Sequence, residues 1–161
     1  MAGGFRFAWE LDGAGWATCR ICDGTSEWKD VVSYLTDALG DTLRAVAGLY
    51  GASAVQRISF ALEPAEARWR LRRQGVDVRV DIYRFPDTMT SWDQPGDAGS
   101  LSWSTTLPRR VLGHAVLEAA EEVLRTHGEV GYRKKWGEHP FPLAALRDLR
   151  RLHRQWDSCR H

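Results

Sequence analysis

The chain has 161 residues, a length at which one domain with one hydrophobic core is expected over residues 1–161. Hydrophobic residues make up 43% and charged residues 27% of the sequence, a balance that excludes a disordered chain. The formal net charge of +1 excludes recruitment of nucleic acid or anionic lipid by the field of the whole chain. Three cysteines cannot all form disulfides within one chain, which suits a reducing compartment.

The predicted elements begin with a β-hairpin. Aromatic and leucine residues alternate with polar or small ones over residues 5–11, as on a strand with one buried face. A glycine-rich turn at 12–15 leads to a second strand over 16–22. From about Asp30 the apolar period becomes helical, and this helix is expected to end at Gly51.

Three further strands are expected around residues 58–62, 67–73 and 76–82. A two-residue turn at Gln74–Gly75 would pair residue 73 with residue 76. That register predicts three pairs on the polar side of the hairpin: Arg72 with Asp77, Arg70 with Arg79, and Arg68 with Asp81. Two of the three pairs have opposite charges, so charge supports the predicted register.

The second half of the chain is expected to alternate between long loops and regular elements. The sequence predicts an exposed loop at 85–100, a strand over 101–105, a helix over 108–127, a linker at 129–141 and a last helix from Pro142. The fold class is therefore α+β, with an antiparallel sheet of about six strands in the order β-β-α-β-β-β-β-α-α and helices packed on one face. The order lacks the βαβ repeat that builds a nucleotide crevice.

Residues with metal-binding or catalytic chemistry are few and scattered. Cys19 and Cys22 form a C-x-x-C motif, to which Cys159 and His161 could add two ligands. Residues three apart on a strand point to opposite faces, so no metal is expected there. His114 and Glu118 are four apart on a helix, a spacing typical of a solvated face. No nucleophile elbow, phosphate-binding loop or HExxH helix is present, so neither catalysis nor a cofactor is expected.

The chemistry that remains is that of a binding surface. Arginines and aromatic residues are enriched at protein interfaces, which favours a non-enzymatic protein that binds a protein partner. The residues expected to bind this partner are Arg70, Arg79, Trp92, Tyr132, Arg133 and Trp136. One alternative is a small-molecule site or small enzyme between segments 85–100 and 129–141, with His139, Glu138 or Tyr132 as acid–base groups.

A second alternative is nucleic-acid binding through the basic C-terminal helix. The arginines that would form this surface are Arg147, Arg150, Arg151 and Arg154. The rest of the chain offers no nucleic-acid-binding signature, so this function is disfavoured. No membrane association is expected either, because the longest stretch without a charged residue, 45–56, has 12 residues. Charges also interrupt the first ten residues, so no export signal is expected and the location is predicted to be cytoplasmic.

Several short motifs together resemble those of a family of small actinobacterial proteins of unknown function. These motifs are Trp9-Glu10-Leu11, Gly15-Trp16-Ala17, the run from Tyr34 to Asp41, Glu63-Pro64-Ala65-Glu66 with Arg68-Trp69, Gly131-Tyr132, Trp136, and His139-Pro140-Phe141-Pro142. The resemblance spans nearly the full chain and implies no activity, ligand or catalytic residue. In size and style the chain also resembles the immunity proteins that neutralise polymorphic toxins, which implies an immunity- or antitoxin-like role.

Overall fold

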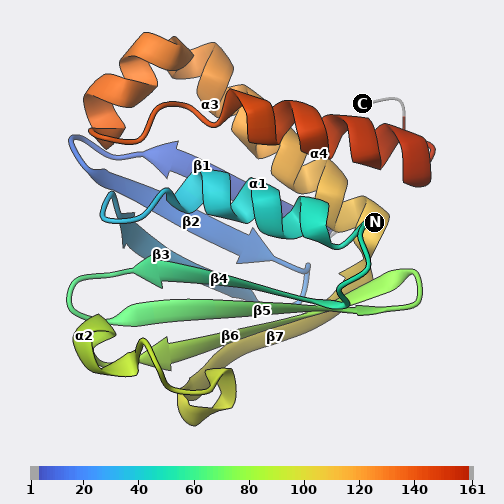
Figure 1. Cartoon of the computed structure of the whole chain (residues 1–161), viewed down its shortest axis with the longest axis horizontal. Coiled ribbons are helices and arrows are strands. Elements are labelled where there is room, and N and C mark those ends of the chain that lie inside the picture. Colours follow the sequence, from blue (N-terminus) through green and yellow to red (C-terminus); the bar gives the residue numbers. More distant parts are fainter. Residues whose placement is uncertain (1–3, 160–161) are drawn as a thin grey trace.

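The computed structural model describes residues 4–159 and shows an α+β fold with antiparallel strands in two sheets (Figure 1). The three-stranded sheet contains β1 (Arg6–Leu11), β2 (Trp16–Cys22) and β3 (Glu27–Ser33). The four-stranded sheet contains β4 (Val55–Ala61), β5 (Glu66–Gln74), β6 (Asp77–Phe85) and β7 (Ser100–Pro108). The helices are α1 (Ala38–Gly48), α2 (Thr88–Ser91), α3 (Arg109–Trp136) and α4 (Leu143–Trp156), with a 3-10 helix η1 (Gly96–Ala98). The predicted α+β class is confirmed.

Strand β3 was not predicted from the sequence, so the described residues form seven strands where about six were expected. Asp23 turns the chain into β3, because its side chain accepts hydrogen bonds from the backbone N–H groups of Thr25 and Ser26, both at 2.9 Å. Trp28 and Val32 are buried on the inner side of the strand. The helix expected from about Asp30 begins only at Ala38.

The four-stranded sheet has the predicted β5–β6 hairpin in a different register. Gly75 and Val76 are the two turn residues, so Gln74 pairs with Asp77. Gly75 has φ +64°, a conformation that glycine adopts without strain at the first central position of a hairpin turn. The three predicted pairs are therefore wrong, and the observed ones are Arg72 with Arg79, Arg70 with Asp81, and Arg68 with Tyr83.

The core lies where the inner faces of the two sheets meet the helices. The fully buried Trp69 ring is central, with ring centroids 5.5 Å from Trp28, 5.5 Å from Phe60 and 6.2 Å from Phe7. Helix α3 packs against β1, and α1 packs against both β4 and α4. One buried cluster thus joins both sheets and the three long helices.

Helix α3 continues beyond the point at which the sequence predicted a linker. Gly128 has φ 65° and ψ 174°, which breaks the helix at the expected place. The chain then resumes a helical course to Trp136, so the expected linker at 129–141 is wrong over most of its length. The Trp136 ring lies 6.1 Å from the Trp9 ring, and Gly15 N donates a 2.6 Å hydrogen bond to Lys135 O. The late part of α3 therefore covers the N-terminal hairpin.

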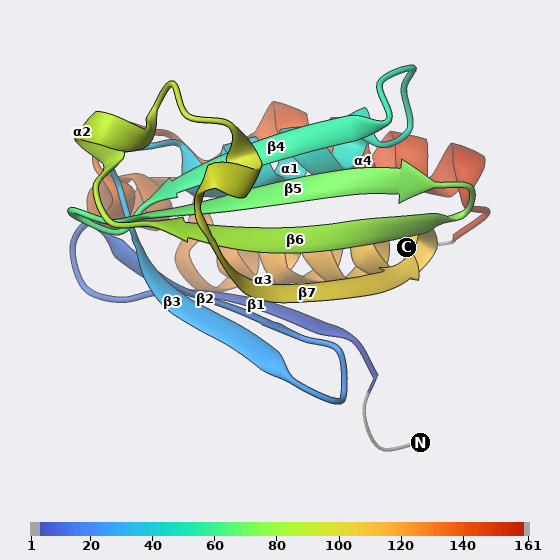
Figure 2. The ribbon, with the colours of Figure 1, turned by 90° about the horizontal axis from the view of Figure 1, so that it is seen from below.

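The segment between β6 and β7 is partly ordered by its own helices. Instead of the expected open loop, residues 86–99 contain α2 and η1, and they lie over the side of the four-stranded sheet that faces away from the long helices (Figure 2). None of the helices within residues 4–159 is long and apolar enough to cross a bilayer.

Candidate functional site

The side of the four-stranded sheet that faces away from the long helices carries an arginine-rich surface. We call it the outer face and define it by Arg57 on β4, Arg70 and Arg72 on β5, and Arg79 and Tyr83 on β6. Strand alternation places these side chains together, because the buried residues between them point to the core. Two of the residues predicted to bind a partner, Arg70 and Arg79, lie here.

One buried carboxylate organises the centre of the outer face. Asp81 is 3% exposed and accepts from Arg70 Nη2 at 3.1 Å and from Arg79 Nε at 3.0 Å. Arg70 Nη2 also donates to the Tyr83 hydroxyl at 2.9 Å. A single negative charge is thus shared by two arginines whose side chains are still 30% and 40% exposed, and the pair retains positive charge.

Arg57 and Arg72 add positive charge that this carboxylate does not balance. Arg57 is exposed and sits opposite Arg70 in the β4–β5 ladder. Arg72 sits opposite Arg79, and its buried Nε has no hydrogen-bond partner among the described residues. Like charges that face each other across a ladder disfavour the isolated sheet, so a negatively charged ligand would stabilise this surface.

A hollow of about 290 Å³ opens on the same face. Its lining combines sheet residues with the turn of the 86–99 segment: Val55, Arg57, Arg68, Arg70, Tyr83, Pro95, Gly96 and Asp97. The hollow is large enough for one side chain of a partner, and its walls offer guanidinium groups, an aromatic ring and, at one side, the Asp97 carboxylate.

The floor beneath the 86–99 segment is a buried ion pair that the sequence did not reveal. Arg68 is 1% exposed and binds Glu66 through two hydrogen bonds of 2.9 Å. Burial alone would raise the pKa of Glu66, but hydrogen bonds from Arg68, Ser59 and Ser91 outweigh it and hold the pKa below its ordinary value. The Arg68 guanidinium also stacks over the Phe85 ring, with its central carbon 4.2 Å from the ring centroid.

Arg68 fixes the backbone on both sides of Trp92. Its Nη2 donates to Ser91 O at 2.8 Å, and its Nη1 donates to Gln94 O at 2.6 Å. Asp87 caps α2 by accepting from the Met89 N–H at 2.8 Å. Trp92 is nevertheless 74% exposed, so a large aromatic ring projects from a turn that is held from below.

Two of the six residues predicted to bind a partner lie in the core instead. Tyr132 and Trp136 are 0% exposed, stacked on each other at 6.2 Å between ring centroids, and neither can reach a partner. Their four-residue spacing is helical, a signal that the basic residues between them masked. Arg133 is exposed, but it lies on α3 and not on the outer face. Of the six, only Arg70, Arg79 and Trp92 are brought to one side of the molecule.

The two segments proposed to enclose a small-molecule site are not neighbours. Segment 86–99 lies on the outer face, whereas the chain from Gly137 to Pro142 lies at the helical side, with strands of both sheets between them (Figure 1). Tyr132 cannot serve there as an acid or base, because it is buried and its pKa is raised by desolvation and by Asp37. The structure therefore does not bring these two segments together around one site.

The basic series on the last helix does form one surface. Arg147, Arg150, Arg151 and Arg154 line the same shallow depression on α4. Two of them are already paired, Arg150 with Glu121 at 2.8 Å and Arg151 with Asp148 at 2.6 Å. This pairing lowers the charge available to a phosphate backbone.

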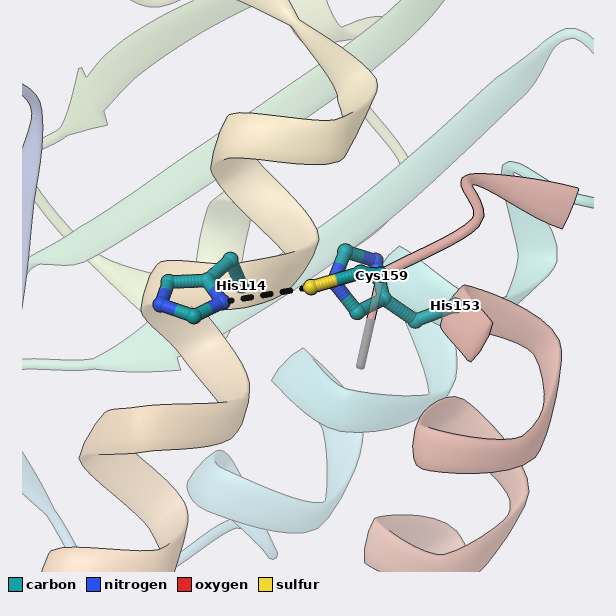
Figure 3. A group of neighbouring side chains, drawn as sticks. All are labelled: His114, His153 and Cys159. Carbon is teal, nitrogen blue, oxygen red and sulfur yellow. Dashed lines mark hydrogen bonds between the residues drawn. The ribbon is translucent and has the colours of Figure 1, made fainter. Parts of the chain in front are cut away.

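The three cysteines are free and do not gather around the C-x-x-C motif. Cys19 is buried on the inner face of β2, where desolvation raises the pKa of its thiol, and Cys22 lies on the other side of the strand. Cys159 lies instead beside His114 and His153, whose ligand atoms and the Cys159 sulfur are all within 4.8 Å of one another (Figure 3). His161 lies outside the described residues.

The histidines of this group come from two helices that pack together. His114 on α3 is half-exposed, and its Nδ1 lies 3.6 Å from Cys159 Sγ. His153 on α4 is fully buried, and its Nδ1 contacts the Tyr50 hydroxyl at 3.1 Å and Asp157 Oδ2 at 3.2 Å. Burial alone would raise the pKa of Asp157, but hydrogen bonds from Tyr50 and Arg109 outweigh it, so its pKa is lowered.

Comparisons of the chain with protein-family models, with curated proteins and with solved structures find no match. The resemblance to a family of small actinobacterial proteins therefore stays a prediction.

Proposed function

We propose that the chain is a non-enzymatic protein-interaction module that binds the acidic surface of a protein partner through the outer face together with Trp92 of the 86–99 segment that lies over it. The observation that supports this most is the pairing of an exposed aromatic ring, Trp92, with a rigid turn. Because Arg68 already holds the backbone at Ser91 and Gln94, little conformational entropy is lost when Trp92 packs against a partner. Exposed tryptophans of this kind are typical energetic centres of interfaces.

Charge supports an acidic partner. Arg57 and Arg72 lack a carboxylate at ion-pair distance within residues 4–159, and Arg79 shares Asp81 with Arg70. Partner carboxylates would relieve the repulsion between these arginines, fill the hollow of about 290 Å³ and fix the orientation of the complex. A cytoplasmic toxin bound by an immunity-like protein would be one such partner, in keeping with the resemblance in size and style.

The test begins with affinity capture from the native lysate, followed by purification of any near-stoichiometric protein and measurement of its dissociation constant. Arg57→Glu combined with Arg79→Glu should weaken binding by about 100-fold, because it sets like charges against the partner. Trp92→Ala should weaken it by about 30-fold, which corresponds to an interface anchor of about 2 kcal/mol. Each variant should keep the circular dichroism spectrum of the wild-type chain.

Arg147→Glu is the matched control, since Arg147 is an exposed arginine on α4, away from the outer face. It should change the dissociation constant by less than about threefold. The proposal is wrong if the outer-face variants bind as the wild-type chain does while Arg147→Glu abolishes binding. Capture of nucleic acid, with affinity that falls steeply with salt, would favour the α4 surface instead.

A further inference from the structure

We propose that His114, His153 and Cys159 form a binding site for a transition-metal ion, with Zn²⁺ as the ion that fits best. This site is separate from the proposed protein-binding function, since its residues lie on α3, on α4 and just after α4. Two imidazoles and one thiolate are ligands of intermediate softness. Zn²⁺ prefers nitrogen and sulfur ligands of this kind, whereas Mg²⁺ and Ca²⁺ prefer oxygen ligands.

The distances match the coordination that Zn²⁺ demands. Bonds of about 2.3 Å to sulfur and about 2.1 Å to nitrogen, at tetrahedral angles, separate a sulfur and a nitrogen ligand by about 3.6 Å. His114 Nδ1 and Cys159 Sγ are 3.6 Å apart (Figure 3). All the ligand atoms lie within 4.8 Å, so the remaining separations need to shrink by at most roughly 1.5 Å.

Each histidine also has a carboxylate on its other ring nitrogen, as metal-bound histidines usually do. Glu118 Oε1 lies 3.4 Å from His114 Nε2, which orients Nδ1 toward Cys159. Asp157 Oδ2 lies 3.2 Å from His153 Nδ1, so His153 would donate to it and carry its ring lone pair on Nε2, the atom that the metal would bind. Each carboxylate follows its histidine by four residues. Glu118 lies on the same helix as His114, and Asp157 lies at the end of the helix that carries His153.

The Asp157 carboxylate is itself held in place, which a ligand-orienting group requires. Arg109 Nη2 donates to Asp157 Oδ1 at 2.8 Å, and the Tyr50 hydroxyl donates to Oδ2. Tyr50 and Arg109 are also stacked, with the guanidinium carbon 4.1 Å from the ring centroid. The support of His153 therefore extends to the chain just after α1 and to the start of α3.

A cavity of about 300 Å³ borders the group on the side of His114 and Cys159. Its lining includes Phe5, Arg110, Ala115 and Glu118. Three protein ligands leave one tetrahedral position, which opens toward this cavity and would hold water or a small exchangeable ligand.

The test uses the full, untagged chain, treated with chelator and then titrated with Co²⁺ and with Zn²⁺. Co²⁺ reports thiolate binding by a charge-transfer absorption, and competition with Zn²⁺ gives the affinity of the latter. We expect one equivalent of metal to bind and the charge-transfer band to vanish in Cys159→Ser. Loss of an outer-shell partner weakens metal affinity by roughly 10- to 100-fold. Because His114→Gln removes a ligand itself, it should weaken Zn²⁺ binding by more than that.

Glu118→Gln, an exposed position, should weaken binding by about 10-fold through the orientation of His114. The matched controls are Cys22→Ser and His139→Gln, which remove a half-buried cysteine and a half-buried histidine elsewhere and should leave metal binding unchanged. Zn²⁺ should raise the melting temperature of the wild-type chain and of both controls, but not that of Cys159→Ser. Any one of three results overturns the proposal. The charge-transfer band could be absent from the wild-type chain, it could survive in Cys159→Ser, or it could be lost in Cys22→Ser.

Discussion

Replacement of Arg68 by methionine should destabilise the protein more than the loss of any exposed arginine. Methionine keeps the length and the apolar stem of the side chain, so the change removes mainly the guanidinium. Glu66 is 3% exposed and would keep only its hydrogen bonds from Ser59 and Ser91, both of 2.6 Å. A buried carboxylate would then remain without its counter-charge.

The magnitude follows from that burial. Removal of one partner of a buried ion pair costs about 3–5 kcal/mol, because the other charge is left desolvated. With an unfolding entropy of about 2.1 cal/mol/K per residue, 161 residues give about 0.34 kcal/mol/K. Arg68→Met should therefore lower the melting temperature by about 9–15 °C.

The assays are thermal unfolding and urea unfolding at neutral pH, each followed by tryptophan fluorescence and by circular dichroism. The variant Arg68→Met should also be cut faster by protease within 86–99, because Ser91 O and Gln94 O lose their donor. The double variant Glu66→Gln with Arg68→Met should lose less than the sum of the single losses. A loss below about 1 kcal/mol for Arg68→Met, or full additivity in the double variant, would show that the buried Glu66 does not depend on the Arg68 charge.

Three further outcomes are expected. Trp136→Ala should lower the free energy of unfolding by about 3–5 kcal/mol, because the ring is fully buried. Trp92→Ala should lower it by less than about 1 kcal/mol, because that ring is exposed. Denaturant titration of both variants measures the two losses. In the chelator-treated, metal-free chain Cys19 should resist Ellman's reagent until the chain unfolds, since it is buried and its pKa is raised, while the other two thiols react in the folded state. The lowered pKa of Glu66 stabilises the fold above the ordinary carboxyl pKa, and this contribution is lost as the pH falls through the lower, folded-state value. The stability difference between the wild-type chain and Glu66→Gln, measured from pH 7 down to about pH 3, should shrink toward acid; a constant difference would contradict the shift.

The strands with uninterrupted alternation could be predicted from the sequence, and β3 shows what breaks that signal. Its inner side carries Trp28, Asp30 and Val32, so a charged residue occupies the middle of the apolar series. In the structure Arg84 of β6 reaches across and donates to Asp30 Oδ2 at 3.0 Å. The other carboxylate oxygen accepts from the Val31 N–H at 2.9 Å, and the ion pair with a residue 54 positions away could not be read from the local sequence.

The candidate sites depend still more on tertiary contacts. The arginine alternation on β5 and β6 revealed which side chains share a face, but the pairing depended on whether Gly75 is the first or the second residue of the turn. The burial of Tyr132 follows from the way the chain resumes a helix after Gly128. The His114, His153 and Cys159 group is invisible in sequence, because the packing of α3 on α4 brings together residues that are up to 45 positions apart.

The contact between Trp9 and Trp136 has a consequence for synthesis on the ribosome. The side of the N-terminal hairpin that carries Trp9 can be covered by the last turns of α3 only after 127 further residues have been added. At about 5–20 residues per second this takes roughly 6–25 s. During that time an aromatic strand surface stays open in the nascent chain, so chains that stall before Trp136 should be bound by chaperones or aggregate, whereas the completed chain should not.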